Sequence, residues 1–128
     1  MDTKSFADVY LESAIETAPP AKLVRMLTEG AVRFLERGAV CSPTSDRVKF
    51  VNGLTRARSI VTELRLALVP AEGSDVAPQL DRLYLFCEDR IGQALTDASP
   101  EPARDAQRVL ATLLDAWQRV DLDAEKPS

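Results

Sequence analysis

Carboxylates are the most numerous groups in this sequence that could do chemistry. The chain has 20 Asp and Glu residues, and Glu88 and Asp89 are adjacent in a segment with helical spacing. Paired carboxylates can act as general acid and base or hold a metal ion. Neighbouring residues on a helix point about 100° apart, however, and no set of metal ligands accompanies this pair. We therefore expect Glu88 and Asp89 on a solvated helix face, and Asp121 and Asp123 in a tail that frays.

The other groups that catalytic sites need are scarce. The chain has no histidine, which removes the commonest general base, and its 5 glycines form no phosphate-binding motif. Cys41 and Cys87 show no metal or redox spacing, and Cys87 is expected to be a small core side chain. The sequence therefore predicts no enzyme, no metal and no cofactor. An enzyme that uses carboxylates alone stays open as one alternative.

Length and charge indicate what kind of partner the chain binds. A chain of 128 residues is expected to form one domain that needs no disulfide or metal for stability. Its net charge of -4 disfavours nucleic acid and anionic membranes as partners. No apolar run approaches the roughly 18 residues of a membrane span, and no secretory segment is visible. We therefore expect a cytosolic protein with protein partners, no nucleic acid and no membrane insertion.

Apolar residues that recur every three or four positions predict four helices and no strand. These helices are expected at Pro20–Val40, Asp46–Leu68, Val76–Thr96 and Pro100–Val120. Because short connections join them, consecutive helices should run antiparallel. We predict an all-α, antiparallel up-down four-helix bundle at 20–120, with an N-terminal extension at 1–19 that packs on the bundle and a frayed tail at 121–128. The expected inward stripe of the first helix is Leu23, Leu27, Ala31, Phe34 and Gly38.

The second and third predicted helices carry more apolar residues than one buried stripe requires. The surplus residues are Val48, Val51, Ile60, Leu66, Leu85 and Phe86. A contiguous exposed patch of this kind is rare unless it is covered or binds something. We therefore predict a groove that accepts another chain's amphipathic helix. The predicted groove residues are Val48, Val51, Asn52, Ile60, Leu64, Leu83, Tyr84, Leu85 and Phe86.

Two of the groove residues have alternative interpretations. Asn52 either faces solvent beside Gly53, whose small size would let two helices approach, or is a partly buried amide that holds a partner backbone. Tyr84 is either a core residue with its hydroxyl at the rim or a groove residue, and its place on the inward stripe favours the core.

Apolar residues also precede the first predicted helix. Phe6, Tyr10 and Ile15 lie in the segment that ends at the double proline Pro19 and Pro20. We expect this segment to cover part of the groove in the free protein. Alternatively, the surplus apolar surface is the interface of a homodimeric adaptor or regulatory protein with no peptide client.

A longer pattern runs through nearly the whole chain. Its positions are Tyr10, Thr17, Pro20, Leu23, Met26, Leu27 and Gly30, then Asn52, Ala57, Ile60, Glu63 and Leu64, then Leu80, Leu83, Tyr84, Arg90, Ile91 and Trp117. In their order and spacing these residues resemble the FliS-type flagellin export chaperones. Two positions depart from the family pattern: Thr28 stands where a tyrosine is usual, and Pro19 stands where an N-cap serine or threonine is usual.

The resemblance implies a cytoplasmic four-helix protein without catalytic activity. Chaperones of this family hold the disordered C-terminal segment of newly made flagellin and prevent its premature polymerisation. They then deliver flagellin to the flagellar type III export gate, and a co-chaperone or regulator is a further implied partner. The N-terminal segment would cover part of the apolar surface and move aside for the client.

Overall fold

A computed structural model describes residues 21–67 and 76–125 of the chain. These ranges contain four helices, α2 (Ala21–Ala39), α3 (Arg47–Ala67), α4 (Val76–Asp97) and α5 (Glu101–Glu125). The described ranges contain no strand, which confirms the predicted all-α class. Helix α5 continues to Glu125, beyond its predicted end at Val120. The predicted extension at 1–19, with Phe6, Tyr10, Ile15 and Pro19, lies outside the described residues.

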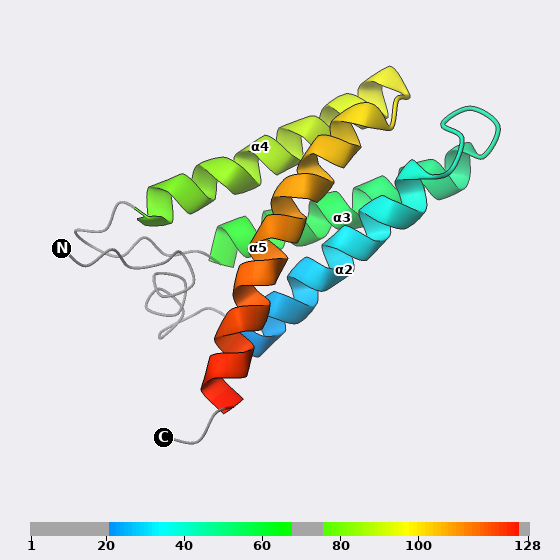
Figure 1. Cartoon of the computed structure of the whole chain (residues 1–128). Coiled ribbons are helices and arrows are strands. Elements are labelled where there is room, and N and C mark those ends of the chain that lie inside the picture. Colours follow the sequence, from blue (N-terminus) through cyan, green and yellow to red (C-terminus); the bar gives the residue numbers. More distant parts are fainter. Residues whose placement is uncertain (1–20, 68–75, 126–128) are drawn as a thin grey trace.

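The four helices form a closed bundle. Each helix packs against its neighbour in the sequence, and α5 completes the ring by packing against α2. Consecutive helices run in opposite directions, so the α2–α3 and α4–α5 connections lie together at one end, which we call the loop end (Figure 1). Helices α2 and α4 begin, and α3 and α5 finish, at the opposite end, which we call the open end. The predicted antiparallel bundle is therefore confirmed for the described helices.

The core contains one inward apolar stripe from each of α3, α4 and α5. Its fully buried members are Phe50, Leu54, Ala57, Val61 and Leu64 of α3, Leu80, Tyr84, Cys87, Ile91 and Ala94 of α4, and Ala103, Ala106, Leu110, Leu113 and Trp117 of α5. Burying one large apolar side chain stabilises a fold by about 1.5–3 kcal/mol, so this core supplies the main driving force for folding. No described helix is both long and apolar enough to cross a membrane.

The buried stripe of α2 is rotated relative to the predicted one. Val24, Thr28 and Leu35 are completely buried, whereas Leu23 is 43% exposed and Leu27 is only half-buried. A shift of one residue turns a helix by about 100°, which moves the Leu23 side of α2 from the core to the seam with α3. The Thr28 hydroxyl donates a hydrogen bond of 2.8 Å to the Val24 carbonyl oxygen, so burial does not leave it unpaired.

Helices α2 and α3 touch backbone to backbone near the loop end. A Cβ atom added to Gly53 would stand 2.8 Å from the Cα atom of Gly38 and 2.8 Å from the carbonyl oxygen of Phe34. A Cβ atom added to Gly38 would in turn stand 3.2 Å from the Cα atom of Gly53. Backbone atoms cannot move aside as a flexible side chain can, so this crossing accepts only glycine. The interpretation of Gly53 as a site of close helix approach is confirmed.

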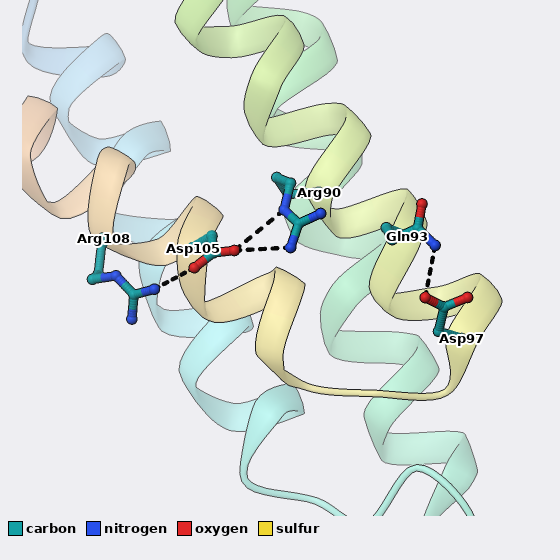
Figure 2. A network of polar contacts seen from close by, with 5 residues as sticks. All are labelled: Arg90, Gln93, Asp97, Asp105 and Arg108. Atoms are coloured by element: carbon teal, nitrogen blue, oxygen red, sulfur yellow. Dashed lines mark hydrogen bonds and ion pairs between the residues drawn. The ribbon is translucent and has the colours of Figure 1, made fainter.

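Helices α4 and α5 are joined by a polar network beside their connection (Figure 2). The Arg90 guanidinium donates two hydrogen bonds, of 3.2 and 2.9 Å, to one carboxylate oxygen of Asp105. Arg108 donates to the other oxygen of the same carboxylate. In the last turn of α4, the Gln93 amide donates to Asp97 at 2.6 Å. These groups are at least one-third exposed or on the surface, so each contact contributes about 1 kcal/mol or less.

The glycine crossing predicts opposite effects for two alanine substitutions in the same helix pair. In Gly53→Ala the new methyl group clashes with backbone, and we expect a loss of about 1–3 kcal/mol in the free energy of unfolding. In the control, Gly30→Ala, the added Cβ meets only the Ile60 Cδ1 atom at 3.7 Å. That variant should gain up to about 1 kcal/mol, because alanine is the better helix former. Urea unfolding followed by circular dichroism measures both. A Gly53→Ala protein as stable as the wild type would contradict the crossing.

Candidate client-binding surface

The residues predicted to line the groove differ in their exposure to solvent and in the helix that carries them. Val48 is 81% exposed near the start of α3, and Asn52 is exposed one turn later. Val51 and Ile60 are half-buried and pack against the core. Leu83, Leu85 and Phe86 are exposed on α4. Leu64 and Tyr84, finally, are fully buried. The structure therefore brings together some members of the predicted set and separates others.

Leu64 and Tyr84 are both fully buried members of the core. Both lie on inward stripes, where residues three, four and seven positions away are also buried, such as Val61 and Ile91. A client could contact the Tyr84 ring only if the bundle opened. For Tyr84 the structure selects the core alternative. Both side chains are buried in this structure, and Leu64 also forms part of the wall of a hollow between α2 and α3.

The exposed apolar residues of α4 do not share one face. Leu83 lies seven residues before Arg90, and seven residues are nearly two full turns, so both side chains project from the same side. Arg90 is paired with Asp105 of α5, which places Leu83 on the α5 side of α4. Leu85 likewise lies seven residues before Gly92, whose added Cβ would stand 3.1 Å from the guanidinium of Arg58 in α3. Leu85 therefore borders α3, and Leu83 is too far round the helix to line the same groove.

An apolar hollow opens on the seam between α2 and α3 at the open end. It has a volume of about 490 Å³ and is lined by Leu23, Leu27, Glu63, Leu64, Leu66 and Ala67. Leu66 of α3 is 71% exposed, and Leu23 of α2 is 43% exposed. Met26, three residues after Leu23 on α2, is 49% exposed. Solvent-facing leucine side chains around one concavity are a typical docking site for an apolar helix. We call this the apolar hollow.

Sequence analysis missed the α2 side of the apolar hollow. It placed Leu23 and Leu27 in the buried stripe and gave Met26 no role, although it counted Leu66 among the surplus apolar residues. The information was present in the spacing, because Leu23, Met26 and Leu27 lie three and four positions apart and form a second apolar stripe. Two apolar stripes on α2 compete for the core, and spacing alone does not decide which one is buried.

A second, more polar hollow lies on the seam between α3 and α4. It has a volume of about 710 Å³ and is lined by Thr55, Arg58, Ser59, Thr62, Glu63 and Leu95. The Thr55 hydroxyl is already bonded to the Val51 carbonyl oxygen at 2.8 Å. A groove lined with hydroxyl groups offers hydrogen bonds more than apolar contact. Of the two seams beside α3, the α2 side is therefore the better apolar binding site.

A charged pair also joins α3 to α4. The Nε atom of Arg65 donates to the Glu88 carboxylate at 2.9 Å, and a second carboxylate, Asp81, lies 3.9 Å from the same guanidinium. The hydrogen bond that Arg65 donates to Glu88 raises the pKa of Arg65. Glu88 is buried and Asp89 is exposed, so the expectation of a solvated face is wrong for Glu88. A partner 23 residues away in the sequence makes the burial tolerable.

Four antiparallel helices with an apolar hollow on one seam define a helical bundle suited to binding another chain. Within the described residues, no group of His, Cys, Asp and Glu side chains could hold a metal ion. The family model for the flagellar protein FliS matches residues 3–124, nearly the whole chain. The chain therefore belongs to the FliS family.

Relatives with known names agree with this assignment. The flagellar secretion chaperone FliS of Vibrio cholerae is 28% identical over 117 residues, which cover 91% of this chain and 86% of the relative. The Salmonella typhimurium protein of the same name is 28% identical over 118 residues, covering 91% and 87%. The flagellar secretion chaperone FliSB of Pseudomonas aeruginosa is 26% identical over 120 residues, covering 91% and 93%.

The two cysteines should differ sharply in reactivity. Burial, together with the charge of Glu88, raises the pKa of the Cys87 thiol to about 12. At pH 8 only about one Cys87 thiol in ten thousand is then the reactive thiolate. Cys41 is half-buried, and its thiol donates to the Arg37 carbonyl oxygen at 3.2 Å.

We expect iodoacetamide at pH 8 to add one group to the folded protein, at Cys41, and a second group only in denaturant. Intact-mass spectrometry reports the number of groups. The Cys41→Ser variant should gain none while folded. Rapid modification of Cys87 in folded protein would contradict the buried position of this thiol.

Proposed function

We propose that this protein is a cytosolic, non-catalytic export chaperone whose client is the C-terminal segment of flagellin. The observation that carries the proposal is the apolar hollow, where Leu23 and Leu66 expose large side chains around a concavity of about 490 Å³. Its relatives bear the name flagellar secretion chaperone, which supports a secreted flagellar client. An amphipathic client helix would place its apolar face in this hollow.

The same contact accounts for the proposed chaperone activity. A client segment held on α2 and α3 is no longer free to pack against other flagellin molecules, so polymerisation is delayed until export. The client loses conformational entropy when it folds on the bundle, which keeps the complex specific but reversible. Release at the export gate of the flagellar type III apparatus then requires no chemical step. A co-chaperone or regulator would bind a different face.

The N-terminal segment is proposed to compete with the client. Phe6, Tyr10 and Ile15 supply the apolar side chains that would occupy the hollow in the free protein. Competition lowers the apparent affinity in proportion to the fraction of molecules whose hollow is uncovered. Deleting residues 1–16 should therefore strengthen client binding or leave it unchanged. A large loss of affinity would instead make the segment part of the binding site.

Calorimetry with a synthetic C-terminal flagellin peptide, from the flagellin of the same organism, tests the client. We expect micromolar or tighter binding by the wild-type protein. Leu66→Ser removes an exposed apolar anchor and should weaken binding about tenfold, or by about 1.4 kcal/mol. Val40→Ser is the matched control, because Val40 is 64% exposed and does not line the apolar hollow. Its affinity should equal that of the wild type.

Two outcomes would contradict the proposal. One is the absence of peptide binding at micromolar concentration. The other is a tight homodimer in sedimentation experiments that buries α3 and α4 and excludes the peptide, which would support the adaptor alternative.

A further inference from the structure

A second hollow on the α2–α3 seam lies near the loop end and is cationic. It has a volume of about 350 Å³. Arg37 of α2 and Lys49 and Arg56 of α3 surround it, and Phe34 and Gly53 form part of its lining. We call this the cationic hollow. It shares the seam with the apolar hollow, so one helix laid along the seam would contact both.

Arg56 is held in a fixed orientation at this hollow. Its guanidinium carbon lies 5.6 Å from the centre of the Phe34 ring, a cation–π distance. Its Nε atom donates a hydrogen bond of 3.1 Å to the side-chain oxygen of Asn52. These contacts use one face and one N–H group, so the two terminal amino groups stay available to an acceptor. Asn52, predicted from the sequence to line the groove, thus positions an arginine there.

The three cations lack an acidic partner within the described part of the chain. No carboxylate in those ranges lies within ion-pair distance of Arg37, Lys49 or Arg56, although the protein as a whole has a net charge of -4. Other arginines of the same helices do face carboxylates: Arg33 lies 3.4 Å from Glu29, and Arg65 lies 2.9 Å from Glu88. Three like charges around one concavity repel each other, and a bound anion relieves that repulsion.

We propose that the cationic hollow binds a side-chain carboxylate of the same client helix that fills the apolar hollow. The proposal rests on the function proposed above and adds the chemistry of the client. The client helix carries apolar residues at one end and an Asp or Glu at the other. The carboxylate forms ion pairs with Arg37, Lys49 and Arg56, and the preorganised Arg56 guanidinium supplies the directional hydrogen bonds.

The geometry of α3 sets the spacing that the client must have. Leu64 of the apolar hollow and Arg56 of the cationic hollow are eight residues apart, which is about 12 Å along a helix. Between the hollows, Gly30 faces Ile60 and leaves room for a passing helix. Glu63 lines the apolar hollow and repels an acid there. The client carboxylate therefore lies about two helical turns from the apolar anchors, on the loop-end side.

Charge removal at the cationic hollow tests the proposal. Arg37→Gln combined with Lys49→Gln removes two charges and leaves the Arg56 contacts intact. The matched control is Lys22→Gln combined with Arg82→Gln, which removes one exposed lysine and one exposed arginine outside the hollow. The probe is the C-terminal flagellin peptide, and calorimetry is run at about 50 and about 300 mM NaCl.

We expect the hollow variant to bind the peptide at least tenfold more weakly at low salt and to lose most of the salt dependence. The control variant should stay within twofold of the wild type. A peptide with every Asp and Glu replaced by Asn or Gln should bind the wild type as weakly as the unmodified peptide binds the hollow variant. A peptide amidated at its C-terminus should bind normally.

The outcomes separate the two proposals. No binding by the wild type would overturn both the flagellin client and the carboxylate site. Equal binding by the wild type and the hollow variant would overturn the carboxylate site alone. A loss of affinity caused by amidation, with none from the Asp and Glu replacements, would also overturn it, because the terminal carboxylate would then be the anion bound.

Discussion

The backbone contact between Gly38 and Gly53 is the constraint on which the rest of the structure depends. It brings α2 and α3 together at the loop end, and helices in contact cross at an angle rather than lie parallel. The seam between them continues to the open end, where Leu23 and Leu66 line the apolar hollow. A bulkier residue at the crossing would change the fold and the proposed binding site together.

The same constraint places α3 between two seams of different chemistry. Toward α2 the surface changes along its length, from the apolar hollow at the open end to Arg37, Lys49 and Arg56 near the loop end. The surface of α3 toward α4 offers hydroxyl groups, and the Arg65–Glu88 ion pair joins these two helices. Apolar contacts would supply most of the affinity for a client helix, and the cations would fix its register. This combination of apolar and ionic contacts suits a chaperone that must bind its client firmly and still release it.

Much of the fold could be predicted from the sequence because helical periodicity is local. The stripes of α3 and α5, such as Phe50 to Leu64, follow directly from spacing, and the helix boundaries agree within a few residues at most ends. The phase of α2 could not be predicted, because two apolar stripes alternate and one includes the polar Thr28. Only contacts with α3 and α5 decide which stripe is buried.

The candidate site was harder to predict because it depends on pairs of residues far apart in the sequence. Glu88 is buried because Arg65 approaches it, and only the contacts of Arg90 and Gly92 show that Leu83 lies toward α5 and Leu85 toward α3. Surplus apolar residues indicated that a binding surface exists, but spacing gave no information on which seam it occupies. The exposed positions of Leu23 and Met26 supply that information.

The central claim is that the α2–α3 seam receives the client. Methyl NMR of the full-length protein during titration with the C-terminal flagellin peptide tests it most directly. The account predicts the largest shift changes at the methyl groups of Leu23, Met26 and Leu66, with core methyl groups such as those of Leu110 little affected. Changes concentrated at Leu83, on the α5 side of α4, with Leu23 and Leu66 unmoved, would contradict it.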